Sequence, residues 1–388
     1  MRTITSTVAV LASSLSLALG GEAVAQSRAP LPSTLATPNV YVVPLAGPDG
    51  GSGQMGTDIN MQLFERYIED IKKTKPDIIV IDLFSADVNQ NFYLQDDDRG
   101  EFGLGLIEDY RGMVKRFQED LRDIPQIMWV RDSVGFGSLI ALAWPELYIR
   151  SDGRIMGLSR VGQMAGGWED PDVASKMDRA IKGMANGFLE QGGYPLVLGE
   201  AMMTPSESLS IKFEGRNVVW MPDASGVWIV DNSPEQVANF SALLAEESGL
   251  AKGVADDLGD LMFLLGYREY NKLENGEKIG KSYVEDWRKA FDRCRDWLRD
   301  AIETDEDSAG LARRVSLLGN IVDAMKRYPA IEYKARIERM PSRMELELLI
   351  DNLKKDIARM KEAEKRNRGS GGGGRGGGGG MGGLGGGR

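Results

Sequence analysis

Short, wholly apolar runs alternate with amphipathic stretches along the first part of the chain. The runs Val40–Leu45, Ile78–Asp82 and Ile127–Val130 predict strands that are buried on both faces. Between them, apolar residues recur every three or four positions, which predicts helices over Asn60–Lys73 and Leu104–Leu121. This alternation predicts an α/β fold with a largely parallel sheet, covered on both faces and joined by right-handed crossovers.

The stretch that follows the third strand is the first candidate site. Its pattern predicts a tight glycine-bearing turn, a short apolar helix over Ser138–Ala143 and a strand over Leu147–Arg150. A turn at Ser151–Gly153 and a further strand follow. A turn that leaves a strand and opens a helix points backbone N–H groups outward, and such groups can hold an anion or an oxyanion.

Local patterns predict further elements in the middle of the chain. They are a helix over Pro171–Gln191, a hairpin of Val218–Met221 with Val227–Val230, a helix from the Ser233–Gln236 capping box to about Glu247, and a helix over Val254–Leu265. From 281 to 365 apolar residues again recur at helical spacing, which predicts a separate helical appendage, antiparallel or coiled-coil-like. Residues 366–388 are mostly glycine with four arginines and no acid, which predicts a disordered tail.

The beginning of the chain predicts export. Residues 1–25 have one arginine, an apolar middle and an Ala-Val-Ala end, which is the pattern of a signal peptide cleaved after Ala25. Residues 26–38, rich in Pro, Ser and Thr, predict a disordered lead-in. No later apolar run approaches the length of a membrane span. We therefore expect a periplasmic or secreted protein, and the single Cys294 means that it has no internal disulfide.

Composition narrows the possible chemistry. The chain has no histidine in 388 residues, which excludes a Ser-His-Asp triad and any histidine-ligated metal. The acidic run Asp96–Asp98 lacks the spacing of a calcium loop, so no metal or other cofactor is predicted. The net charge of −11 argues against nucleic acid as the main partner.

Several segments together resemble the ClpP/crotonase superfamily, and within it the serine peptidases of the NfeD and signal-peptide-peptidase-A types. The matching segments are VYVVPL at Val40–Leu45, IIVIDL at Ile78–Leu83, GSLIALAWPELYI at Gly137–Ile149 and LLAEESGLAKGVADDLGDLMFLLG at Leu243–Gly266. The resemblance implies a spiral of ββα units over residues 39–268. It also implies a peptide or protein substrate and assembly into a homo-oligomer.

In that family a Ser-Lys dyad cleaves peptides, with a neutral lysine as general base. Lys176 matches the lysine of the family's helix. A gapless alignment places Gly135 at the nucleophile position, whereas Ser133 keeps the family's S-x-G spacing if two residues are inserted before the helix. Ser138, one residue past the turn, is expected to cap the helix. The oxyanion would be held by backbone amides near Gly135 and Gly137, and by those of Leu83–Ser85.

Two departures from the family pattern leave the activity open. The nucleophile is displaced, and Asp82–Asp87 lacks the two glycines that usually form the oxyanion loop. The sequence therefore predicts a ClpP-like serine peptidase homologue, either active through Ser133 and Lys176 or catalytically degenerate. The alternative is a non-catalytic scaffold that binds peptides or oligomerises. A third reading, an acyl-CoA-processing crotonase relative, is the weakest because no CoA-binding signature is present.

Overall fold

The computed structural model describes residues 29–86, 101–162, 170–215 and 217–370. The expected signal peptide, the acidic run Asp96–Asp98 and the glycine-rich segment after Ser370 lie outside the described residues.

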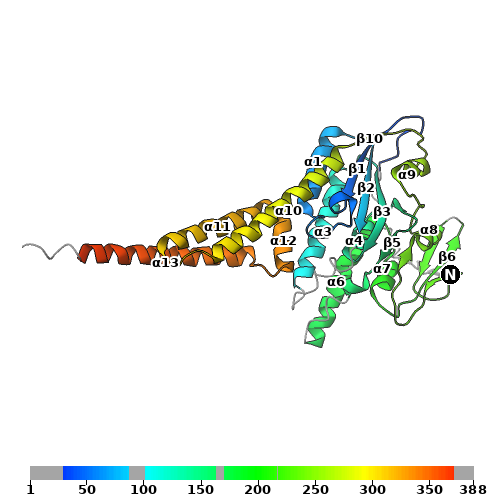
Figure 1. Cartoon of the computed structure of the whole chain (residues 1–388). Coiled ribbons are helices and arrows are strands. Elements are labelled where there is room, and N and C mark those ends of the chain that lie inside the picture. The colour runs from blue at the N-terminus through cyan, green and yellow to red at the C-terminus, as the bar shows by residue number, and fades with distance from the viewer. Residues whose placement is uncertain (1–28, 87–100, 163–169, 216, 371–388) are drawn as a thin grey trace, which may run out of the picture.

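A mixed α/β body is built around one parallel-rich sheet (Figure 1). Its strands run in the order β10-β1-β2-β3-β5-β9, with β4 also paired to β3. They are β1 (Asn39–Leu45), β2 (Ile78–Ser85), β3 (Gln126–Val134), β4 (Leu147–Ile149), β5 (Arg154–Met156), β9 (Phe240–Ser241) and β10 (Asn271–Leu273). All of these pairs are parallel except that of β5 with β9. The expected α/β class with a largely parallel sheet is confirmed.

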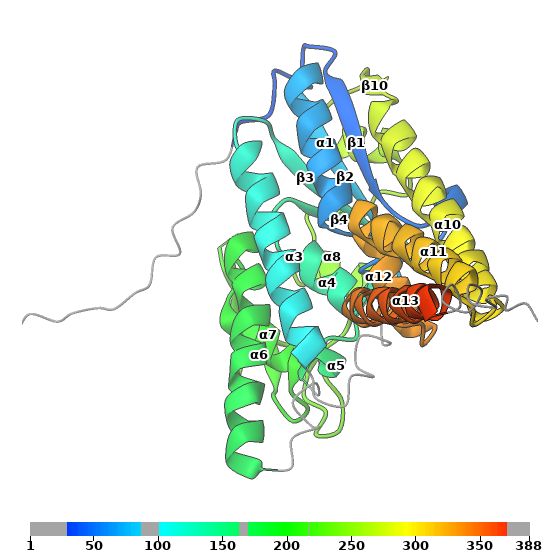
Figure 2. The same ribbon diagram turned by 90° about the vertical axis from the view of Figure 1, so that its left-hand side faces the viewer.

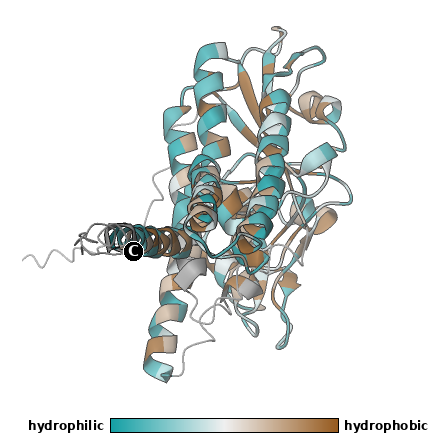
Figure 3. Ribbon diagram, turned by 60° about the vertical axis from the view of Figure 1, so that its left-hand side comes forward, coloured by the Kyte–Doolittle hydropathy of each residue, from teal (hydrophilic) through white to brown (hydrophobic). Residues whose placement is uncertain are grey.

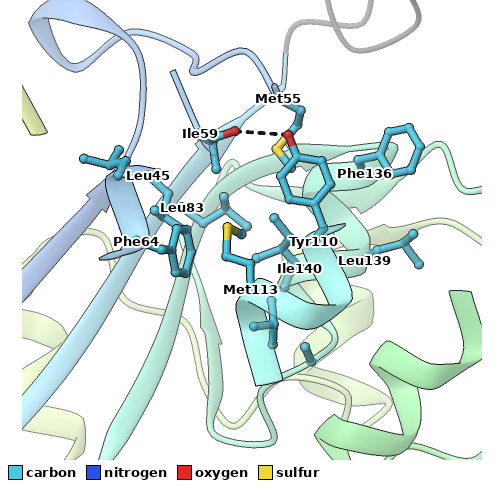
Figure 4. Packing of buried hydrophobic residues seen from close by; sticks show 14 of the residues in the cluster. Leu45, Met55, Ile59, Phe64, Leu83, Tyr110, Met113, Phe136, Leu139 and Ile140 are labelled. Atoms are coloured by element: carbon cyan, nitrogen blue, oxygen red, sulfur yellow. Dashed lines mark hydrogen bonds between the residues drawn. The ribbon is translucent and has the colours of Figure 1, made fainter. Parts of the chain in front are cut away.

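Helices cover one face of this sheet. They are α1 (Met61–Thr74), α3 (Glu101–Asp120), α4 (Phe136–Ala141) and α6 (Pro171–Gly192). The side chain of Asn60 caps α1 by accepting a hydrogen bond from the Leu63 amide at 3.1 Å. Figure 4 shows Phe64 of α1 and Met113 of α3 beside Leu83 of β2, in the main buried core. Figure 3 shows hydrophilic positions on the outer sides of the helices.

The opposite face of the sheet has a second, smaller core. Because successive side chains of a strand point to opposite faces, Val80 and Trp129 lie here, while their neighbours Ile81 and Met128 face the helices. Helix α9 (Leu258–Leu264) covers this core with Leu261 and Met262. The predicted helix over Val254–Leu265 starts late, because Asp257 is its N-cap and accepts from the Asp260 amide at 2.9 Å.

Strand β4 lies beside residues 252–255, which precede α9. The Lys252 amide donates to the Leu147 carbonyl at 2.7 Å, and the Ala255 amide donates to the Ile149 carbonyl at 2.9 Å. The Trp129 indole N–H donates to the Ala255 carbonyl at 2.9 Å. Two segments about one hundred residues apart are thus joined in one folding unit.

A three-stranded antiparallel sheet corrects the predicted hairpin. Strands β7 (Asn217–Met221) and β8 (Trp228–Asp231) do not pair with each other; β6 (Leu209–Glu214) lies between them and pairs with both. The sequence analysis did not predict a strand at β6. Because β6 pairs with both β7 and β8, these two strands do not pair with each other.

The helix predicted from Ser233 to Glu247 is also wrong in its first half. The Ser233 hydroxyl does accept from the amides of Glu235 and Gln236, at 3.3 and 3.2 Å. The chain then extends to reach the sheet edge as β9, where Phe240 is buried, so helix α8 (Ala242–Glu247) begins only after Ser241. The remaining short elements are η1 (Pro48–Gly50), α5 (Ser159–Gly162) and α7 (Leu196–Met203).

The C-terminal helices form an arm that projects from the body (Figures 1 and 2). They are α10 (Asn275–Ile302), α11 (Ser308–Arg327), α12 (Pro329–Ile337) and α13 (Arg343–Ser370). Two contacts near its base illustrate how the arm joins the body. The Tyr283 hydroxyl lies 2.8 Å from the Asn60 amide nitrogen, and Arg288 pairs with the buried carboxylate of Asp58 at 3.1 Å. No helix among the described residues is long and apolar enough to cross a membrane.

Candidate functional site

The turn between β3 and α4 is where the sequence places the candidate active site. Strand β3 ends at Val134 and α4 begins at Phe136, so Gly135 alone makes the turn and no extra residues precede the helix. Gly135 has φ 62° and ψ −123°, a conformation that glycine adopts at little cost and that strains other residues. The residue at the nucleophile position of the gapless alignment therefore carries no side chain.

Ser133 lies on β3, two residues before this turn, and its side chain is fully buried. Its hydroxyl oxygen is 3.1 Å from the Arg154 carbonyl oxygen and 3.1 Å from the hydroxyl oxygen of Ser138. Both contacts join β3 to its neighbours in the fold. A nucleophile must reach substrate, and this hydroxyl instead takes part in internal hydrogen bonds.

Ser138 does not cap α4 as expected. It is the third residue of that helix, whose N-cap is Gly135 without any side-chain hydrogen bond. The Ser138 hydroxyl oxygen accepts from the Met156 amide at 3.1 Å and lies 2.9 Å from the Met156 carbonyl oxygen. Ser138 is therefore buried as a link between α4 and β5.

Lys176, the expected general base, is exposed on α6. The buried residues of that helix begin only at Ile181, and its N-terminal end projects from the body (Figures 1 and 2). A lysine that acts as a base near neutral pH has to be shielded from water. The hydrogen bonds of Ser133 go to β5 and α4 and not to this lysine, so the structure does not present the two residues as a dyad.

The two glycines expected to hold an oxyanion serve packing. The Gly135 amide donates to the Met156 carbonyl at 2.9 Å. A Cβ on Gly137 would come within 2.9 Å of the Ser85 Cβ, so the end of β2 lies directly against the first turn of α4. Ser85 is itself buried and donates to the Gly53 carbonyl at 2.9 Å. The close contact between Gly137 and Ser85 fills the space beside the turn.

The sequence analysis missed two charged pairs that join neighbouring strands of the sheet. Asp82 of β2 accepts from Arg131 of β3 at 2.6 Å, and both side chains are more than four-fifths buried. Burial raises the pKa of the Asp82 carboxyl, and the adjacent Arg131 guanidinium opposes this rise. Asp132 likewise accepts from Arg154 at 2.7 Å. For the first pair a signal was available, since Asp82 and Arg131 each directly follow an apolar run of two adjacent parallel strands.

Each pair joins two neighbouring strands of the sheet, β2 with β3 and β3 with β5. The Arg131 guanidinium also stacks over the Phe84 ring, 5.0 Å from its centroid. Within the part of the chain that the structure describes, no cluster of three or more Cys, Asp or Glu side chains could hold a metal ion.

Because Ser133 is buried and Lys176 is exposed, their alanine substitutions should differ in their effects on stability. Ser133→Ala should lower the free energy of unfolding by about 1–2 kcal/mol, because it removes a buried partner from Ser138 and from the Arg154 carbonyl. Lys176→Ala should change it by less than about 0.5 kcal/mol, because the side chain is exposed. Urea unfolding of both variants measures this. Equal losses would contradict the structural role of Ser133.

Comparisons with known proteins do not assign this chain to a family. No protein-family model matches the chain, and no curated protein matches it either.

Proposed function

We propose that this protein is an exported, non-hydrolytic scaffold whose α/β core is related to the ClpP/crotonase superfamily. The observation that carries the proposal is Gly135, which occupies the strand-to-helix turn in a conformation suited to glycine. A peptidase of this type would need a hydroxyl at that turn, and the two serines nearest to it in the sequence are both buried in internal hydrogen bonds.

Two features of the sheet support the proposed relationship to that superfamily. The matching segments Val40–Leu45 and Ile78–Leu83 form adjacent parallel strands in the centre of one sheet. The later segment around Lys252–Ala255 runs parallel to β4, which belongs to the third matching segment. A spiral of ββα units would bring these pieces together, and the spiral itself remains part of the proposal.

A peptidase acting through Ser133 and Lys176 is the competing function. It would require Ser133 to give up its contacts with Ser138 and Arg154, and the exposed end of α6 to carry Lys176 to it. No described contact favours that rearrangement. An acyl-CoA-processing activity has no support from the described residues either.

A serine-directed fluorophosphonate probe tests the proposal. We expect the mature protein to remain unlabelled under conditions that fully label an active serine hydrolase, and to leave a mixed peptide library uncleaved. Ser133→Ala and Lys176→Ala should behave identically to the unsubstituted protein in both assays. Labelling or cleavage that disappears in Ser133→Ala and in Lys176→Ala would overturn the proposal and establish the dyad.

Export is tested separately, because it depends only on residues 1–25. Expression of the full chain in a bacterium with two membranes should yield a protein that starts at Gln26, recovered outside the cytoplasm. Recovery of the uncleaved chain from the cytoplasm would remove export from the proposal without affecting the account of the turn.

A further inference from the structure

Exposed apolar side chains gather where the first described residues of the chain cross the end of α9. Leu31 and Leu35 are 42% and 97% exposed, and Phe263 and Leu264 are 66% and 48% exposed. Scattered exposed apolar residues are ordinary, but a group of them marks an interaction site. We name these four residues the apolar patch.

Two contacts hold the two segments of the apolar patch together. The Tyr267 hydroxyl donates to the Pro32 carbonyl at 2.6 Å. A Cβ on Gly266 would lie 3.0 Å from the Thr34 Cγ2, so the two segments are in direct contact there as well. Each contact lies within four residues of the exposed apolar positions on both segments. The patch is therefore one surface and not a count along the chain.

The geometry of α9 explains why its last side chains point outward. Leu261 and Met262 are buried in the smaller core, so the next two residues, Phe263 and Leu264, project from the other side of the helix. The helix then stops at Gly266, which has φ 94° and whose amide donates to the Phe263 carbonyl at 2.9 Å. These apolar side chains are fixed in an exposed position by a rigid element.

The charges around the apolar patch narrow its partner. The exposed charged residues of α9 and of the segment after it include Asp257, Asp260 and Glu269, against Arg268. A partner drawn by positive charge, such as an anionic lipid surface, gains nothing from this surroundings. Any contact here has to be carried by the apolar side chains themselves.

The position of the apolar patch along the chain indicates what it meets. Leu31 lies six residues after Ala25, the end of the expected signal peptide. A signal peptide inserts in the membrane before it is cleaved. Six extended residues span at most about 20 Å, so the patch comes out beside the lipid surface.

We propose that the apolar patch binds the surface of a lipid bilayer, with Leu35 and Phe263 entering the boundary between headgroups and acyl chains. The proposal relies on the proposed export only for the place where the protein meets lipid. Figure 1 shows α9 on the side of the body away from the arm, so a molecule bound in this way would direct its arm away from the membrane. Binding through so few side chains is reversible, since even one whole acyl chain gives only marginal attachment.

Vesicle flotation of the mature chain from Gln26 tests the proposal. The native protein should float with vesicles of phosphatidylcholine, and it should still do so in about 1 M salt, where the Debye length falls to about 3 Å. The variant Leu35→Ser/Phe263→Ser should lower the partition coefficient by at least about tenfold, because two side chains no longer remove apolar surface from water.

Ile302→Ser/Leu348→Ser is the matched control. These residues are 74% and 63% exposed on the arm, so the variant loses a comparable amount of exposed apolar surface far from the patch. It should float like the native protein. Thermal unfolding followed by circular dichroism should be the same for both variants and the native chain, because all four positions are exposed.

An environment-sensitive dye attached to Leu35→Cys locates the contact. Its emission should shift to the blue when phosphatidylcholine vesicles are added, whereas the dye on Ile302→Cys should not respond. The native Cys294 is buried, and burial raises the pKa of its thiol to about 11, so it should stay unlabelled.

Three results would overturn the proposal. They are a native chain that does not float, flotation that Leu35→Ser/Phe263→Ser leaves unchanged, and flotation that requires anionic lipid and is lost in high salt. The last result would assign membrane binding to basic side chains elsewhere. Because the vesicle assay uses the mature chain, a failure of export would not change its outcome, and the fluorophosphonate assay is independent of both.

Discussion

Replacing Gly276 by alanine is expected to destabilise the protein by about 3 kcal/mol, although alanine is the better helix former. Gly276 lies in the first turn of α10, where that helix crosses β1. A Cβ at this position would overlap the carbonyl oxygen of Val42 and come within 2.8 Å of the Tyr41 ring. The backbone of a central strand cannot move aside cheaply, so the overpacking cost exceeds the gain in helix propensity.

Gly319 provides the matched control for Gly276→Ala. It lies inside α11, and a Cβ there would meet nothing within 4 Å. Gly319→Ala should therefore stabilise the protein by about 0.5–1 kcal/mol through helix propensity alone. Urea unfolding followed by circular dichroism measures both variants. If Gly276→Ala were as stable as the native protein, α10 could not be packed against β1 as the structure places it.

The second large effect is expected from Arg288→Met, which removes the partner of a buried carboxylate. The Asp58 side chain is 1% exposed and accepts two hydrogen bonds from Arg288, each 3.1 Å long. Breaking a buried pair leaves an uncompensated charge, which is costly. Because the Arg288 side chain is 44% exposed, we expect a moderated loss of about 2–3 kcal/mol at neutral pH.

The pH dependence of this loss follows from the pKa of Asp58. Burial raises that pKa above its ordinary value, and Arg288 opposes the rise. A carboxyl group whose folded pKa exceeds its unfolded pKa contributes stability that is fully present below the unfolded value, and this is lost as pH rises through the folded value. Without Arg288 the folded pKa rises further. The deficit of Arg288→Met should therefore be largest at neutral pH and should shrink towards pH 4.

Unfolding by urea across this pH range, with two further variants, checks the explanation. Arg293→Met changes an exposed arginine of the same helix and should shift the free energy of unfolding by less than about 0.5 kcal/mol at any pH. Asp58→Asn in the Arg288→Met background removes the buried charge and should recover much of the loss near neutral pH. A deficit that stays constant with pH would show that Arg288 acts through packing instead.

The sequence by itself determined the elements that depend on short-range patterns. The apolar runs at Val40, Ile78 and Ile127 form the three central strands, and the helix predicted over Asn60–Lys73 appears as Met61–Thr74. The pattern of apolar residues is enough to predict these strands and this helix, because the apolar residues of each element define the face that it buries. The absence of histidine likewise excluded whole classes of chemistry before any fold was known.

Only the tertiary structure decided which strands pair and which polar groups stay accessible. Strand β7 pairs with the neighbouring strand β6, which separates it from β8, and the chain after Ser233 extends to the sheet edge as β9, so two locally favoured arrangements did not form. The sequence spacing of Ser133 resembles that of a nucleophile, but its hydroxyl is hydrogen-bonded to Ser138 and to the Arg154 carbonyl of β5. The side chain of Lys176 is exposed to solvent. Whether a side chain is buried and which group it bonds depend on how separate elements pack together. The spacing of residues within one element does not predict either property.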